Sequence, residues 1–499
     1  MGLRTPEQFR NSLRDGRVVY YKGKRVEDVA AHPVLKIGVD SSAVDYELAE
    51  DPQWRELAVV ESADAAPFSR FFLAPRSSED LLRRRKLVET GSRICFGFPP
   101  FAKEGGSDAV NALAIVTSRC DAANGTNYAR RLETFRSFLQ REDLSISITM
   151  TDAKGDRSLR PSEQADPDLY LRKVRDVPGG IIVRGAKAHI TTAPYTNEFC
   201  VLPTRALSAA ERAYAVAFAI PANTSGIRII ARSGPWEEGF IDYPVANRAS
   251  MVEGLVIFDD VFVPDERIFL NGEWQFAGPL AQMFANYHRV TAAAYKYPFA
   301  ELLAGSAQLV AECNGVDRVA HVRDKIAWLV MYAESILALS EAACHKAVQD
   351  PGTGLYYPDP VIGNAGKFFF ADNYHAAVKA VQDIAGGIIA TIPSEHDWNN
   401  PETQPYLAKY LAGSQKATVE ERFRVIHLIK DLVASELGGF WEVTSLHAEG
   451  SLAAERLATY AHADMKRYRD AARRAAQLGP RLEQPLPRTD SERHGALKS

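Results

Sequence analysis

The sequence predicts an α+β protein built from three successive parts: a helical part, a β part and a helical bundle. Two changes in the spacing of apolar residues predict this order. Helical spacing gives way to strand-like alternation near Ser145, and helical spacing returns after Phe269. The length of 499 residues also favours several domains over one core. We expect domains at residues 1–143, 144–272 and 273–477, and a flexible tail at residues 478–499.

The first part is mainly helical. Thr5 followed by Pro6 is typical of a helix N-cap and first helical position, and Ser77 precedes a charged helix in the same way. Lys22-Gly23 predicts a small hairpin. The expected elements are a hairpin over 18–26 and helices beginning at Pro6 and over 77–88, 108–119 and 128–140.

The middle part alternates as short strands separated by turn residues, which predicts a compact β-barrel or sandwich, and we expect a β-barrel domain. The expected strands are 145–150, 198–203, 215–220, 226–230 and 254–263. The last part has long amphipathic segments, enough for a four-helix bundle. These segments are 287–297, 317–349, 362–384 and 417–437.

Composition limits the class of protein. A formal net charge of -4 and a pI near 6.3 argue against a nucleic-acid binder. No apolar run approaches the roughly 18–20 residues of a membrane span, and the N-terminus has no apolar signal core, so we expect a cytoplasmic protein. The five cysteines are scattered without a CxxC pair, which is typical of free, buried thiols.

The stretch from Thr151 to Thr192 is the best candidate for a ligand-binding segment. Lys154 and Arg157 lie in a turn-forming run, and Thr191 and Thr192 follow a predicted strand. Hydroxyls and cations on two backbone-rich segments suit a flat, anionic ligand such as a flavin dinucleotide. The alternative is an ordinary charged surface turn.

Several motifs resemble the family of 4-hydroxyphenylacetate 3-hydroxylases and 4-hydroxybutyryl-CoA dehydratase. The resemblance covers about residues 90–460 and implies an acyl-CoA dehydrogenase-like fold, with flavin between the β-domain and the bundle. The wording of the motifs is nearer to the dehydratase branch. They are Thr151–Arg157, Gln164–Asp168, Gly185–His189, Val256–Pro264, His288-Arg289, Tyr295–Pro298, Gly386–Glu395 and Glu449–Ser451.

The chain departs from both branches of this family. The dehydratase branch binds an iron–sulfur cluster through a histidine, which matches His288, and three cysteines, whose positions hold Pro100, Glu104 and Tyr295. Such clusters need thiolates, so we expect no cluster and no metal. At the Arg and Tyr positions of the hydroxylases stand Gly105 and Ala109. We therefore expect the altered loop (Pro100, Glu104, Gly105 and Ala109) to determine the substrate.

The resemblance also implies roles for other residues. His288 is expected to act as an acid/base group, together with Tyr295, Lys296 and Glu253; the alternatives are a structural histidine, a snorkelling lysine and an exposed glutamate. Gly386 and Gly387 imply close approach to a cofactor phosphate of a neighbouring subunit, or else a helix C-cap. Glu449 is a weaker candidate for closing the site from the bundle.

These observations favour a cytoplasmic flavoprotein, an FADH2-dependent monooxygenase that acts as the oxygenase component of a two-component system. A separate flavin reductase would supply FADH2, and O2 would oxidise a small organic or aromatic substrate through a C4a-hydroperoxyflavin. The family implies a homotetramer or dimer. The alternative is a cluster-free acyl-CoA dehydratase or isomerase in which His288 and Glu253 move protons. A third possibility is a flavin-binding scaffold without activity.

Overall fold

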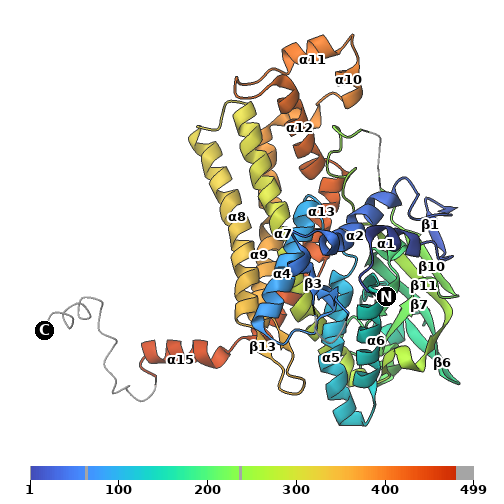
Figure 1. The fold of residues 1–499 in the computed structure, drawn as a ribbon. Coiled ribbons are helices and arrows are strands. Elements are labelled where there is room, and N and C mark those ends of the chain that lie inside the picture. Colours follow the sequence, from blue (N-terminus) through green and yellow to red (C-terminus); the bar gives the residue numbers. More distant parts are fainter. Residues whose placement is uncertain (1, 62–65, 235–238, 479–499) are drawn as a thin grey trace.

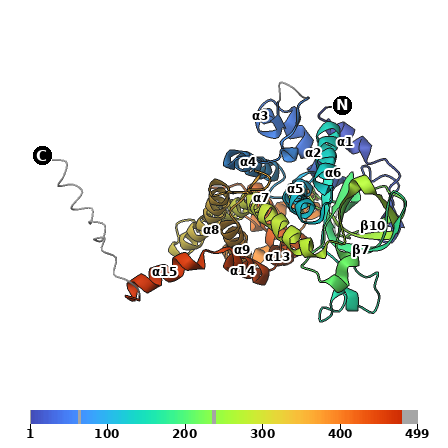
Figure 2. The same ribbon diagram turned by 90° about the horizontal axis from the view of Figure 1, so that it is seen from below.

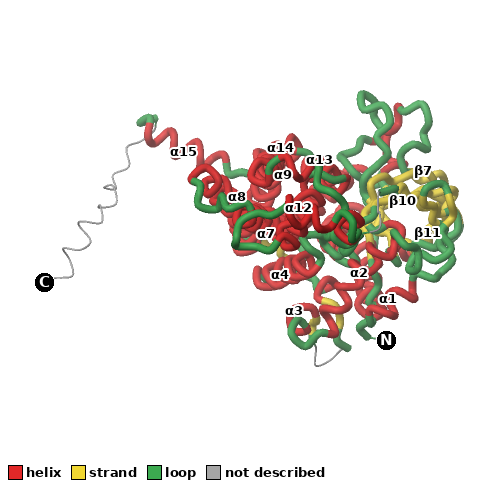
Figure 3. Tube along the Cα trace, turned by 90° about the horizontal axis from the view of Figure 1, so that it is seen from above, coloured by secondary structure: helices red, strands yellow, loops and turns green. Residues whose placement is uncertain are grey.

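The computed structural model describes residues 2–61, 66–234 and 239–478. It confirms the α+β class and the three-part order, with helices first, strands in the middle and a long helical bundle last (Figure 1). Seen from above, the strands gather on one side of the molecule and most helices on the other (Figure 3). The residue boundaries assigned to the domains stay predictions.

Side-chain caps fix where the first helices begin. Thr5 accepts a hydrogen bond from the Gln8 amide, and Ser77 accepts one from the Asp80 amide, as their positions before a helix predict. The third predicted helix begins earlier than expected, at Glu104. The helices are α1 (Pro6–Ser12), α2 (Leu35–Glu50), α3 (Arg55–Ala58), α4 (Ser78–Ile94), α5 (Glu104–Asn124) and α6 (Tyr128–Glu142). Of these, α2 and α3 were not predicted.

The strands form two main sheets that curve around a shared apolar core (Figure 2). One has the order β2-β1-β10-β11-β7-β6 and the other β12-β9-β8-β5. The predicted N-terminal hairpin joins the first sheet, where β1 pairs in parallel with β10. The strands are β1 (Val19–Tyr21), β2 (Lys24–Arg25), β5 (Ile146–Thr149), β6 (Arg172–Val177), β7 (Gly180–Thr191), β8 (Glu198–Val201), β9 (Val216–Pro221), β10 (Ile227–Ala231), β11 (Glu253–Pro264) and β12 (Ile268–Asn271). Two small pairs lie outside these sheets, β3 (Val59–Val60) with β4 (Phe68–Ser69) and β13 (Val348–Gln349) with β14 (Tyr356–Tyr357).

The last part contains four long helices, as predicted: α7 (Ala277–Cys313), α8 (Ala320–His345), α9 (Pro360–Ala385) and α12 (Val419–Val433). Several predicted helix ends were wrong. Helix α7 extends beyond both ends of the predicted 287–297 helix. Residues 348–349 form a strand instead of extending α8, and Ser435 ends the 417–437 helix early by capping α13 (Glu436–His447). Shorter helices complete this part: α10 (Glu395–Asn399), α11 (Gln404–Tyr410), α14 (Leu452–His462) and α15 (Met465–Ala475). Most of the predicted tail, residues 479–499, lies outside the described residues.

Helix α7 holds the parts of the molecule together. It packs against α4 and α5 of the first part and against α8, α9 and α12 of the bundle. Its central residues, 286–300, are therefore buried on all sides. Polar side chains in this stretch need partners from other elements, because unpaired polar groups are costly to bury. These partners build the candidate site.

Candidate functional site

His288 of α7 forms a buried pair with Asp108 of α5. The His288 Nδ1 lies 3.0 Å from Asp108 Oδ2, although the two residues are 180 positions apart in the sequence. Arg84 of α4 donates to the other carboxylate oxygen of Asp108 at 2.7 Å. Burial alone would raise the pKa of Asp108, but Arg84 and the bond with His288 outweigh burial and hold this pKa below its ordinary value.

This geometry determines which nitrogen of His288 faces the site. An ionised Asp108 accepts a hydrogen bond from Nδ1–H, so the neutral imidazole carries its lone pair on Nε2. Among the described residues, Nε2 has no hydrogen-bond partner. His288 is therefore arranged to accept a proton from a bound molecule, as an acid/base group requires.

A second polar group surrounds Glu449, which lies in the turn between α13 and α14. The Glu449 carboxylate accepts hydrogen bonds from the Tyr295 hydroxyl and from Lys296 Nζ. Burial would raise the pKa of Glu449, but Lys296 and Lys367 lower it to about 2. Burial lowers the pKa of Lys296 to about 8, despite the favourable charge of Glu449. Lys296 is therefore the member of this pair that can release a proton near neutral pH, while Glu449 stays ionised.

Phe101 links these two groups. Its ring centroid lies 6.0 Å from that of His288 and 5.5 Å from that of Tyr295, edge to face in both cases. His288 and Tyr295 thus lie on the same side of α7, as their spacing predicts. Gly105 also borders His288, because a Cβ at position 105 would lie 3.5 Å from His288 Cε1 and 2.9 Å from Ile148.

The other predicted loop residues contact the protein itself. The Pro100 carbonyl accepts from the Ser42 hydroxyl at 2.7 Å. The Glu104 carboxylate accepts from the amides of Phe101 and Lys103, each at 3.1 Å. Ala109 is fully buried in the apolar core. Of the four predicted substrate contacts, the structure brings only Gly105 next to His288.

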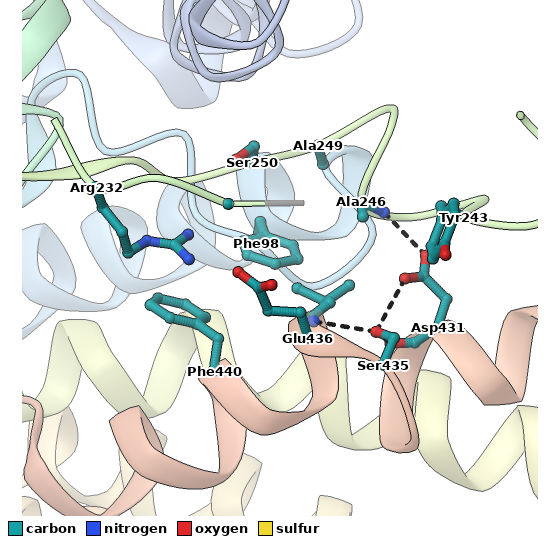
Figure 4. Close-up of a pocket in the computed structure, with 12 residues that line it drawn as sticks. Phe98, Arg232, Tyr243, Ala246, Ala249, Ser250, Asp431, Ser435, Glu436 and Phe440 are labelled. Carbon is teal, nitrogen blue, oxygen red and sulfur yellow. Dashed lines mark hydrogen bonds between the residues drawn. The ribbon is translucent and has the colours of Figure 1, made fainter. Parts of the chain in front are cut away.

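Glu253 begins β11 and is partly buried, not exposed. It accepts a hydrogen bond from Arg232 at 2.9 Å, yet burial keeps the pKa of Glu253 above its ordinary value. Arg232 also lies over the Phe440 ring at 4.3 Å. Figure 4 shows the pocket beside this pair, between Phe98, the 243–250 segment and the start of α13, and its walls are mostly apolar and aromatic.

The turn with Lys154 and Arg157 lies beside the end of β7. Thr151 accepts from the Ala188 amide at 2.8 Å, and buried Lys187 bonds to Asp152 at 2.6 Å. Gly155 has a φ of +53°, and a Cβ there would meet Leu169 at 2.3 Å, so the turn requires glycine. Lys154 and Arg157 are exposed and carry their charges into solvent beside the strand.

The threonines at the end of β7 differ. Among the described residues, the Thr191 hydroxyl makes no hydrogen bond, whereas the Thr192 hydroxyl donates to the Thr191 carbonyl at 2.7 Å.

Gly386 and Gly387 are exposed at the end of α9, in a segment that packs on α12. Gly386 has a φ of +79° and its amide bonds to the Gln382 carbonyl, so it also serves as the helix cap.

All five cysteines are buried and free. Cys95, nearest the altered loop, directs its sulfur to the Ser41 carbonyl at 3.8 Å, and burial raises the pKa of its thiol. Within residues 2–61, 66–234 and 239–478, no three His, Cys, Asp or Glu side chains are placed to hold a metal ion. The residues near His288 therefore do not fit a cluster that requires thiolates.

Sequence reasoning missed Asp108, Arg84 and Arg232, and gave Glu449 too little weight. A signal existed for Asp108, which is a lone acid followed by Ala109 and Val110 in an apolar helix. A buried acid needs a cationic or hydrogen-bonding partner. Nothing local identifies which residue that partner is.

Comparison with known proteins supplies the context. Residues 5–270 match the N-terminal domain of the 4-hydroxyphenylacetate 3-hydroxylase family, and residues 277–477 match its C-terminal domain. The 4-hydroxybutyryl-CoA dehydratase/vinylacetyl-CoA-Δ-isomerase of Clostridium aminobutyricum is 33% identical over 91% of this chain and 95% of its own length. The oxygenase component of 4-hydroxyphenylacetate 3-monooxygenase from Thermus thermophilus is 30% identical over 85% and 87%. A solved oxygenase component of this type, complexed with FAD and 4-hydroxyphenylacetate, superposes with a TM-score of 0.87 at 28% identity, over 94% and 98%.

Proposed function

Because the chain belongs to the 4-hydroxyphenylacetate 3-hydroxylase family, we propose that it is a reduced-flavin-dependent monooxygenase acting on a small organic substrate. The observation that carries this proposal is the buried Asp108–His288 pair, in which Nε2 has no hydrogen-bond partner among the described residues. Oxygenation of a phenol ring is eased when the phenol loses its O–H proton. A neutral imidazole held by a carboxylate accepts that proton near neutral pH.

The residues beside β7 fit a flavin. Lys154 and Arg157 provide exposed cations for the pyrophosphate, and the Thr191 hydroxyl is available for the edge of the ring system. When bound, reduced flavin supplies the two electrons with which one atom of O2 enters the substrate and the other leaves as water. The chain would receive FADH2 from a separate reductase, as an oxygenase component of a two-component system does.

The pocket beside Arg232 supports a substrate with an aromatic ring. Phe98, Tyr243 and Phe440 provide flat apolar surface, and Ala246 and Ala249 line the opposite side with small side chains. Arg232, which donates to Glu253 behind it, and Glu436 give this apolar pocket a polar end. A ring would bury apolar area here while its polar group meets that end.

The second candidate is a cluster-free acyl-CoA dehydratase or isomerase. The contact of Tyr295 and Lys296 with Glu449 favours it, because this buried group can move protons without oxygen. The 33% identity to the dehydratase/isomerase also supports it. His288 and Glu253 would then shuttle protons on a thioester substrate.

A single experiment separates the two. Purified protein is mixed with FADH2 and O2 and a panel of phenols, and, without O2, with vinylacetyl-CoA or 4-hydroxybutyryl-CoA. We expect an oxygen-dependent phenol product, which His288→Ala lowers by roughly 10²–10⁴-fold while flavin binding persists. His345→Ala, at an exposed histidine of α8, is the matched control. Thioester turnover without O2, and no oxygenated product, would establish the second candidate instead.

A further inference from the structure

A second buried ion pair lies behind Glu449. Lys367 of α9 and Glu455 of α14 have no exposed side-chain area, and their Nζ–Oε1 distance is 3.0 Å. Removing two charges from water costs more than such a pair usually regains. Apolar side chains could replace a pair that only stabilised the fold. The position of Lys367 and Glu455 beside the Glu449 turn therefore suggests another role.

Lys367 holds the turn that carries Glu449. Its Nζ donates to the carbonyls of Ser445 and Gly450, each at 3.2 Å, on either side of the glutamate. From α7, Arg289 Nε donates to the Glu449 carbonyl at 3.1 Å. The turn thus receives one cation from α9 and one from α7, and both grip its backbone.

The backbone of the turn is strained where it is gripped. Glu449 has a φ of +57°, which side chains other than glycine rarely adopt. Gly450 has a φ of +110°, and a Cβ there would lie 2.8 Å from Arg289 Nη2. Surrounding contacts must impose such a conformation. The clamp therefore aims the carboxylate at Tyr295 and Lys296.

The same pair acts electrostatically on Lys296. Lys296 Nζ is faced by Glu449 from the turn, by the Tyr295 ring of its own helix, by Phe370 and Lys367 of α9, and by Glu455 of α14. The charge of Lys367 opposes protonation of Lys296, and the charge of Glu455 favours it. Neutralising Lys367 alone should therefore raise the pKa of Lys296, and neutralising Glu455 alone should lower it.

We propose that Lys367 and Glu455 are positioning residues, a buried pair that holds the Glu449 turn and balances the charge of the Lys296–Glu449 pair. They act through Glu449 and Lys296, and they do not touch the substrate. Only the turnover test of this role rests on the proposed function.

The test uses Lys367→Met, Glu455→Gln and the double variant in the full chain. For each, unfolding free energy is measured against pH, with and without Lys296→Met, so that the difference isolates Lys296. A lysine whose folded pKa is lowered gives a stability that rises with pH, from about 8 upward here, because the unfolded state then binds more protons. We expect this rise to begin at higher pH in Lys367→Met and at lower pH in Glu455→Gln.

Turnover supplies a second measurement. The alkaline limb of kcat/KM against pH should move to higher pH in Lys367→Met and to lower pH in Glu455→Gln, as the onset of the stability rise does. The double variant should return this limb towards its wild-type position. Its kcat should still fall about tenfold or more, because the turn is loosened. Arg267→Met with Glu198→Gln, a largely buried pair of the β part at 3.1 Å in which Arg267 is partly exposed, is the control and should leave the limb in place.

Shifts in the same direction, or none, in the unfolding data would overturn the proposal. If no substrate turns over, the proposed function fails, but the unfolding measurements still decide this role. Where a single variant does not fold, the double variant is compared with and without Lys296→Met. If the stability of the double variant begins to rise at the same pH as that of the wild type, the balance of charge is supported. If the rise begins at a different pH, the balance of charge is contradicted.

Discussion

At the scale of single residues, the site depends on orientation more than on unusual side chains. His288 is an ordinary helix residue until Asp108 fixes its Nδ1 and leaves Nε2 available. Asp108 in turn accepts a hydrogen bond from Arg84 at 2.7 Å. The Arg84 cation of α4 thus keeps Asp108 ionised, and Asp108 orients His288 of α7. Removing the negative charge should therefore affect chemistry more than shape.

Asp108→Asn tests this dependence. An amide can donate to Nδ1 as well as accept from it, so the imidazole loses its fixed tautomer, and we expect kcat to fall by roughly 10²–10³-fold with flavin affinity nearly unchanged. Stopped-flow turnover and flavin titration measure the two effects. Asp143→Asn, which breaks the buried pair with Lys103 at 2.7 Å, is the control for lost stability. Equal loss of kcat in both variants would remove Asp108 from the proposed chemistry.

At the scale of elements, local signals predicted local structure. The sequence predicted the caps at Thr5 and Ser77 and the helices α6 and α9, because these features depend on residues close together in the chain. The pairing of β1 with β10 was not, since no local pattern encodes a partner so distant in the chain. The site divides in the same way: Tyr295 and Lys296 followed from motif and spacing, while Arg84 and Arg232 depend on tertiary contacts.

The break between α12 and α13 is a local feature with a consequence for the pocket. The Ser435 hydroxyl accepts from the Leu437 amide at 3.0 Å and donates to the Asp431 carbonyl at 2.6 Å, which ends one helix and starts the next (Figure 4). Leu437 and Phe440 of the new helix line the pocket. The cap thus places a wall of the proposed substrate site.

Ser435→Ala should lower the free energy of unfolding by about 1 kcal/mol and also raise KM several-fold, because the start of α13 loosens. Thr418→Ala removes the cap of α12, where the hydroxyl accepts from the Glu421 amide at 3.1 Å away from the pocket. It should cost similar stability and leave KM alone. Chemical denaturation and steady-state kinetics compare the two. A KM change shared by both variants would mean that general loosening, and not the pocket wall, is responsible.

At the scale of the whole molecule, α8 stands at the outer side of the bundle (Figure 1). By length and composition it is the one helix of the described residues apolar enough to cross a membrane, and only 33% of its apolar window is buried. Val330 is 47% exposed and Met331 66%. An apolar face of this kind on a folded protein is usually covered by a partner.

We expect a second copy of the chain to cover this face, which would give a dimer or tetramer in light scattering. Met331→Asp places a charge where the copies would meet, and burying an unpaired carboxylate is costly, so this variant should shift the protein towards smaller species. Arg130→Asp, an equally large change at an exposed position of α6, should leave the mass unchanged. A wild-type monomer that still binds flavin would contradict the expectation, because the glycines at the end of α9 would then have no neighbouring cofactor to approach.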